Sequence, residues 1–263
     1  VFGIGRGSWN SDQASKWGFS SWLSSDINSA NLNKLFKGNG PPDLIYNCSG
    51  SSSVVASMLN PSKSLKDSVI GCSELLEWLK INSPKSRTVF ISSAAVYGSY
   101  YERPILNNDA VGPISIYGAH KLISENLCKH YANQFDLKIV IPRIFSVYGA
   151  GLKKQLIWDF CEKTQTQNNI VLGGSGEEKR DWIEIRDLVK ALSSLSNLAS
   201  YEAPTLNIAS GKPSTVKNII DLIKFNFSES YDIDLNVSFD GKNREGNPKN
   251  LTTDYNELNK LNF

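Results

Sequence analysis

The chain has 263 residues, of which 40% are hydrophobic and 21% are charged, and its formal net charge is +2. This length suits one large α/β domain, or a large domain with a small appendage. The sequence has no basic block, no acidic tail and no apolar run of bilayer-spanning length, which argues against a nucleic-acid or membrane partner. The four cysteines form no Cys-x-x-Cys pair and there are only two histidines, so we expect no metal site, and buried thiols in a reducing cytoplasm.

Short apolar runs alternate with segments of helical periodicity along much of the chain. We expect strands over 1–5, 43–47, 88–92, 137–142 and 206–208. Helical periodicity occupies 61–80, 117–135, 155–163, 185–198 and 216–225. This alternation predicts parallel βαβ units and a Rossmann-like, doubly wound parallel sheet, which binds ligands at the carboxyl ends of its strands. Because the rhythm loosens after residue 150, we expect an NAD(P)-binding domain over 1–150. Residues 151–263 would form mainly a smaller substrate-binding lobe, with some segments returning to the sheet.

Three glycines stand near the start of the chain, at positions 3, 5 and 7. A phosphate-binding glycine loop needs a helix directly after it, because the helix N-terminus holds the pyrophosphate. The residues after Gly7 are polar and have no apolar face, so we favour a strand over 1–5 instead. That strand would be the second of the nucleotide-binding fold, and the sequence would lack the first strand, its glycine loop and its helix. A phosphate loop at positions 3–7 is the alternative.

Arg6 directly follows this strand. The strand end faces the adenosine ribose in dinucleotide-binding folds, where an acidic residue suits NAD and an arginine suits the 2′-phosphate of NADP. No Asp or Glu occupies positions 1–7. The sequence therefore favours NADP over NAD, with a solvated surface arginine as the alternative reading of Arg6.

A tyrosine and a lysine lie four residues apart where the helix predicted at 117–135 begins. Tyr117 and Lys121 therefore share one helix face, one turn apart. An ammonium beside a phenol favours the phenolate and lowers the phenol pKa from about 10 toward the working range. A phenolate can take a proton from a sugar hydroxyl while hydride leaves the carbon. Ser93 follows a predicted strand at the ligand-binding edge, where it would hydrogen-bond the same substrate oxygen; turn chemistry at the strand end is the alternative.

Several further motifs follow one another along the chain. They are Asp26-Ile27, Asn47-Cys-Ser-Gly50, Ser92-Ser-Ala-Ala-Val-Tyr-Gly98, Pro142-Arg-Ile-Phe-Ser-Val-Tyr-Gly149, Arg180-Asp-Trp-Ile-Glu-Ile-Arg-Asp187, Asn207-Ile-Ala-Ser-Gly211 and Arg244-Glu-Gly246. Together with Tyr117 and Lys121, they resemble in number and order the extended short-chain dehydrogenases/reductases, specifically the NAD-dependent epimerase/dehydratase group. The resemblance runs over nearly the whole chain.

The resemblance implies a nicotinamide cofactor, NAD or NADP, and a nucleotide-activated sugar as substrate. It implies catalysis by Ser93, Tyr117 and Lys121, in which Lys121 also holds the nicotinamide ribose. The expected cofactor contacts are Arg6, Asp26, Ile27, Cys48, Ser49, Gly50, Ser92, Tyr117, Lys121 and Phe145. The expected substrate contacts are Ser93, Ala94, Ser146, Arg180 and Arg244. The two arginines suit the pyrophosphate, with internal ion pairs as the alternative.

Two alanines reduce the number of reactions that the sequence favours. Ala94 and Ala95 occupy places where the family's sugar 4,6-dehydratases and decarboxylases carry acidic residues. Elimination of water needs an acid for the leaving hydroxyl and a base for the neighbouring carbon, and alanine supplies neither. We therefore expect epimerisation, or simple oxidation or reduction. A non-catalytic dinucleotide sensor and an inactive fragment of such an enzyme are the alternatives.

Two further expectations come from the resemblance. Ser146 stands where many relatives carry asparagine, so the resemblance does not decide whether Ser146 contacts the substrate in the same way. The helices predicted at 61–80 and 117–135 would form the contact of a homodimer.

Overall fold

The computed structural model describes residues 1–242 and 246–254, so Arg244 lies outside the described residues. Two compact units make up the chain. The first consists of Val1–Ser92, Ile116–Pro142 and Ser193–Thr205, and the second of Ser93–Ser115, Arg143–Leu192 and Leu206–Phe263. The chain therefore passes between the units several times, and the predicted division at residue 150 stays a prediction. Among the described residues, no helix is both long and apolar enough to cross a bilayer.

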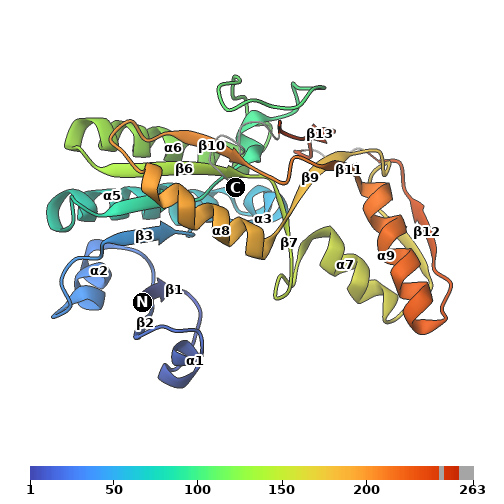
Figure 1. Cartoon of the computed structure of the whole chain (residues 1–263), viewed down its shortest axis with the longest axis horizontal. Helices are drawn as coiled ribbons and strands as arrows, with labels where there is room; N and C mark the ends of the chain where they lie inside the picture. The colour runs from blue at the N-terminus through green and yellow to red at the C-terminus, as the bar shows by residue number, and fades with distance from the viewer. Residues whose placement is uncertain (243–245, 255–263) are drawn as a thin grey trace. The chain divides into compact units, whose positions relative to one another are not determined.

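Parallel strands flanked by helices confirm the predicted α/β class. The strands β3 (Leu44–Asn47), β4 (Arg87–Phe90) and β6 (Lys138–Ile144) pair in parallel. The sheet order is β10-β6-β4-β3, where β10 is Thr205–Ile208, and the short β5 (Ser92–Ser93) also pairs with β6. Figure 1 labels β3, β6 and β10 of this sheet. Val89, Ile139 and Val140 have no exposed surface. Continuous burial of this kind is typical of parallel strands that are covered on both faces.

The helical segment predicted at 61–80 is divided into three parts. The helix α4 (Pro61–Leu65) leads into a π-helical turn, η1 (Lys66–Ile70), and then into α5 (Gly71–Asn82). Asn60 caps α4 by accepting a 3.0 Å hydrogen bond from the Lys63 amide, and Pro61 takes the first helical position. The helix α3 (Val54–Leu59) precedes them.

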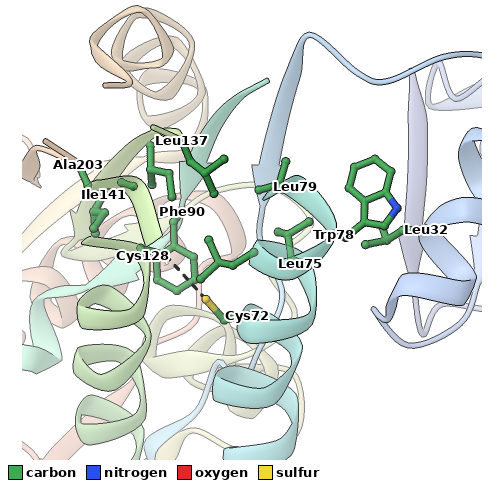
Figure 2. Packing of buried hydrophobic residues seen from close by; sticks show 13 residues of the cluster. Leu32, Cys72, Leu75, Trp78, Leu79, Phe90, Cys128, Leu137, Ile141 and Ala203 are labelled. Atoms are coloured by element: carbon green, nitrogen blue, oxygen red, sulfur yellow. Dashed lines mark hydrogen bonds between the residues drawn. The ribbon is translucent and has the colours of Figure 1, made fainter. Parts of the chain in front are cut away.

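The core of the first unit lies mainly between α5, the long helix that follows β5, and the sheet. The helix α6 (Ile116–Phe135) packs against α5, and Cys72 of α5 approaches Cys128 of α6 to 3.8 Å between sulfur atoms (Figure 2). Leu76 and Leu79 are each 1% exposed. Burial of one such side chain contributes about 1.5–3 kcal/mol to folding, so the packing of these two leucines stabilises the unit.

The first residues form a small sheet of their own. The strands β1 (Phe2–Gly5) and β2 (Ser21–Ser24) pair in parallel, and the helices α1 (Ser11–Lys16) and α2 (Ser29–Phe36) lie beside them. The Trp22 ring covers the glycines, because a Cβ on Gly3 would lie 2.6 Å from it, and its Nε1 donates to the Gly7 carbonyl at 2.9 Å. The predicted strand over 1–5 is confirmed. That a first strand, glycine loop and helix are absent stays a prediction.

The second unit is built around β9 (Lys179–Glu184). Its neighbours are β7 (Ser146–Tyr148) and β13 (Asn250–Leu251), which are parallel to it, and β11 (Pro213–Thr215), which is antiparallel.

A second core in this unit joins two helices to a parallel strand pair. The helices α7 (Gln155–Thr164) and α9 (Val216–Tyr231) contribute Phe160 and Ile220, which pack with residues of β8 (Asn169–Leu172) and β12 (Asn236–Phe239). The remaining helical segments are α8 (Ile185–Leu195), η2 (Ala94–Tyr97) and η3 (Ser196–Leu198).

Candidate active site

The beginning of α6 places Lys121 against the end of a parallel strand. Lys121 is 5% exposed, and its Nζ donates a 2.8 Å hydrogen bond to the carbonyl of Ile91. The same ammonium lies 5.5 Å from the centre of the Phe90 ring. Tyr117, one turn earlier on α6, is partly exposed. Lys121 therefore lies at the end of β4, and its catalytic role together with Tyr117 stays a prediction.

Burial lowers the pKa of Lys121 from its ordinary value. Cys72, Cys48 and, more weakly, Glu125 act in the opposite direction on this pKa. A poorly solvated ammonium attracts a nearby anion more strongly than one in water, because the local dielectric is low. Lys121 is thus suited to stabilise negative charge on a neighbouring oxygen.

A buried serine and a buried glutamate meet one turn further along α6. Ser92 Oγ donates a 2.6 Å hydrogen bond to Glu125 Oε1. Ser92 is 2% exposed and Glu125 has no exposed surface. The Ser92 hydroxyl proton is therefore committed to Glu125, and its predicted contact with the cofactor would use the oxygen lone pairs.

The last residue of β3 carries a buried donor that has no partner within the described part of the chain. Asn47 Oδ1 accepts hydrogen bonds from the Ser49 amide at 3.1 Å and from Ser49 Oγ at 2.6 Å. Asn47 Nδ2 is buried and has no hydrogen-bond partner among the described residues. An unsatisfied buried donor costs about 1–3 kcal/mol, so this position suits a ligand that brings an acceptor. The predicted cofactor loop, Cys48, Ser49 and Gly50, follows it directly, and Cys48 lies within electrostatic range of Lys121.

Three of the predicted cofactor contacts, Arg6, Asp26 and Ile27, lie just after β1 and β2. Arg6 is exposed and forms a 2.7 Å ion pair with Asp67, to which Lys63 also bonds at 3.3 Å. A 2′-phosphate at Arg6 would have to compete with this carboxylate. Asp26 is exposed, whereas Ile27 packs against the core of the first unit.

Ser93 belongs to the second unit and caps η2. Its Oγ accepts a 3.2 Å hydrogen bond from the Ala95 amide, which leaves the hydroxyl proton for another acceptor. Ala94 is fully buried, so its methyl group adds no chemistry to this segment. Ser93 lies in the other unit from Tyr117 and Lys121, and its role with them stays a prediction.

Phe145 and Ser146 lie where β6 passes into β7. Phe145 is 7% exposed, and its amide donates to the Ile208 carbonyl at 3.0 Å. Ser146 pairs in register with Trp182 of β9. The Trp182 Nε1 donor is buried and has no partner among the described residues, a feature that sequence analysis missed.

Arg180 is 8% exposed and forms hydrogen bonds with the chain at residues 247–249. Its NH1 donates to the carbonyls of Lys179 at 2.7 Å and Lys249 at 3.2 Å, and its NH2 donates to Asn247 Oδ1 and to the Pro248 carbonyl, both at 2.7 Å. Burial lowers the pKa of Arg180, although Glu178 acts against this. A substrate pyrophosphate would have to replace some of these acceptors.

The next residue, Asp181, anchors a different loop and was not predicted. Its Oδ1 accepts hydrogen bonds from the amide and hydroxyl of Ser210, both at 2.8 Å, and from the Gly211 amide at 3.1 Å. Burial raises the pKa of Asp181, and the bonds from Ser210 oppose this. The motif that ends at Gly211 therefore has a structural role, because its backbone amides donate hydrogen bonds to a buried carboxylate.

Comparison with known proteins identifies the family. Residues 7–209 match the NAD dependent epimerase/dehydratase family. The chain belongs to this family. An uncharacterized UDP-glucose epimerase of Bacillus subtilis (strain 168) is 31% identical over 137 residues, which are 52% of this chain and 43% of that protein.

Solved structures share the fold of this family member. A UDP-N-acetylglucosamine 4-epimerase from Methanobrevibacter ruminantium M1, in complex with UDP-N-acetylmuramic acid, has a TM-score of 0.78 at 25% identity over 92% of this chain and 76% of that one. A protein called RMD from Pseudomonas aeruginosa, complexed with NADPH, has a TM-score of 0.78 at 19% identity over 99% and 92% of the two chains, which shows the fold alone. The chain spans about half the length of the curated relatives that it matches, with 43%, 55% and 44% covered in three of them.

Proposed function

We propose that this chain is a nicotinamide-dinucleotide-dependent epimerase or oxidoreductase that acts on a nucleotide-activated sugar. The observation that carries the proposal is the buried Lys121 ammonium, held at the end of β4 one helical turn from Tyr117. Relatives described as a UDP-glucose epimerase and a UDP-N-acetylglucosamine 4-epimerase support the choice of substrate class. Among the possible reactions, dehydration and decarboxylation are less favoured, because Ala94 and Ala95 supply neither an acid nor a base.

In this proposal different residues of the chain bind the dinucleotide, transfer the proton and orient the substrate. Bound dinucleotide supplies or accepts a hydride. Asn47 Nδ2 and Lys121 offer it hydrogen-bond donors, and Lys121 also stabilises the phenolate of Tyr117. Tyr117 takes the proton of a sugar hydroxyl, or returns it to a ketone oxygen. Ser93 orients that oxygen, a role that rests on the likeness of its segment to the family's catalytic serine.

We propose NADP as the preferred dinucleotide, with NAD as the alternative. The argument is Arg6 at the end of β1, with Lys63 beside it as a second cation. A 2′-phosphate would replace Asp67 as the partner of these cations. Assays with both dinucleotides separate the two cases.

We also propose that the chain forms a homodimer through α4–α5 and α6. These segments carry exposed aliphatic side chains: Leu65 is 40% exposed, Ile70 49% and Ile123 44%. A second copy would remove this apolar surface from water.

The test of the enzymatic proposal is turnover of UDP- and GDP-sugars. Absorbance at 340 nm reports net redox with NAD(H) or NADP(H), and sugar analysis of the product reports epimerisation. We expect Tyr117→Phe to lower turnover by about 10²–10⁴-fold while dinucleotide binding is retained. Tyr201→Phe, an exposed tyrosine of the same unit, is the matched control and should turn over as the parent does.

Two outcomes contradict the proposal. If Tyr117→Phe turns over as fast as the parent chain, Tyr117 is not the acid/base. If the parent binds dinucleotide but no sugar nucleotide reacts, a dinucleotide sensor explains the chain better.

A further inference from the structure

We infer that Glu125 is a positioning residue of the proposed active site, where its buried carboxylate holds the segment that follows β4 through Ser92 of β5 and acts as a counter-charge to Lys121. The inference rests on the proposed function, because it assigns Glu125 a task at that same site. Every contact that carries it lies within the first unit.

Two consecutive residues at the strand end are held by two side chains one helical turn apart. Lys121 donates to the Ile91 carbonyl at 2.8 Å, and Glu125 accepts from Ser92 Oγ at 2.6 Å. Residues four apart lie one above the other on a helix face, so α6 meets the strand end with a cation and an anion side by side. The two contacts fix the position of Lys121 relative to the strand and leave it little freedom to move.

The burial of both groups gives this arrangement its electrostatic consequence. Lys121 is 5% exposed and Glu125 is fully buried, so water screens neither charge well. Burial lowers the pKa of Lys121, and Cys72, Cys48, Cys128 and, most weakly, Glu125 act in the opposite direction. A protonated Lys121 is the form that stabilises a Tyr117 phenolate. The carboxylate therefore helps to keep Lys121 in its working form.

A purely structural role for Glu125 makes a different prediction. If Glu125 only links α6 to the strand, the pKa of Lys121 depends on the hydrogen bond between Glu125 and Ser92 and does not depend on the charge of Glu125. Glu125→Gln keeps the shape and an oxygen that can accept from Ser92, but it removes the charge. Ser92→Ala removes the hydrogen bond and keeps the charge. The two variants therefore separate the roles.

The measurement is the titration of the Lys121 ammonium by NMR in protein labelled with ¹⁵N-lysine, with Lys121→Arg to assign the signal. We expect the pKa of Lys121 to fall in Glu125→Gln and to stay closer to the parent value in Ser92→Ala. An unchanged pKa in Glu125→Gln overturns the inference. If Glu125→Gln does not fold, Glu125→Asp replaces it: a carboxylate at this place should keep the Lys121 pKa near the parent value, and a marked fall would overturn the inference.

A second readout connects this charge to the reaction. In Glu125→Gln we expect the pH profile of turnover to shift to lower pH, following Lys121, with little change in KM. The titration needs no substrate, so it tests Glu125 even if no sugar nucleotide is turned over. A chain whose turnover depends on Tyr117 but whose Lys121 titrates normally in Glu125→Gln would refute this inference and leave the proposed function standing.

Discussion

His120 is a buried histidine inside the segment that carries Tyr117 and Lys121. It is 8% exposed, and its Nδ1 lies 2.9 Å from Ser64 Oγ. Burial lowers the pKa of His120 below its ordinary value of 6.5. The unfolded chain therefore binds a proton at this residue at a higher pH than the folded chain does. We expect the free energy of unfolding to fall as the pH drops below about 6.5.

The chain offers a matched control for this prediction, because His130 is its other histidine and is exposed. Urea unfolding at pH 7.5 and 5.5 should show a smaller loss of stability in His120→Asn than in the parent. His130→Asn should lose as much as the parent. Equal losses in His120→Asn and the parent would show that His120 does not carry this pH dependence.

Single residues also show where sequence reasoning stops. Tyr117 and Lys121 were found because their spacing of four is visible in the sequence and has a direct meaning on a helix. The partners of Arg180 are mostly backbone carbonyls, and a carbonyl leaves no sign in the sequence. The Trp182 Nε1 donor has no partner among the residues that the structure describes, and this too depends on the fold around it and leaves no sign in the sequence.

A glycine fixes the turn that follows η2. Gly98 has φ of +70°, and a Cβ at this position would lie 2.0 Å from the Gly112 carbonyl oxygen. That oxygen belongs to the backbone and cannot move away easily. We expect Gly98→Ala to destabilise the chain by at least about 1–3 kcal/mol, measured as a lower midpoint of urea unfolding.

Gly38 provides the comparison for Gly98. It also has a positive φ, +82°, but no atom lies within 4 Å of the place its Cβ would take. Gly38→Ala therefore reports the backbone strain without the clash and should be the milder substitution. A Gly98→Ala midpoint equal to that of Gly38→Ala would mean that the contact with Gly112 has no energetic weight.

Strong periodicity explains which elements were predictable. The helix predicted at 117–135 is α6, and the strand predicted at 88–92 is found as β4 and β5. The strand β2 and the helices α1 and α2 were missed, because residues 8–36 mix polar residues and tryptophans without a clear period. The π-helical turn η1 was also missed, since a change in hydrogen-bond pattern leaves the apolar spacing of 61–80 nearly intact.

At the scale of the whole molecule, the order of the motifs along the chain predicted the family, which no single motif could do. The family match over residues 7–209 confirms the predicted family, and the parallel strands confirm the fold class. How the chain divides was harder to foresee, because segments such as Ser93–Ser115 and Arg143–Leu192 join one unit from distant parts of the sequence. Periodicity describes neighbours along the chain and carries no record of such contacts.

The proposed homodimer makes the last prediction. Ile70 and Ile123 are about half exposed on the segments proposed as the contact, and a charge at either position would be buried against a second copy without a partner. We expect the parent chain to have the mass of a dimer by light scattering after size exclusion. Ile70→Glu and Ile123→Glu should shift that mass toward the monomer at micromolar concentration. Val189→Glu, at a 56% exposed position of α8, is the control that should leave the mass unchanged. A monomeric parent, or a dimer that both glutamates leave intact, would place the apolar surface of these helices outside any contact between copies.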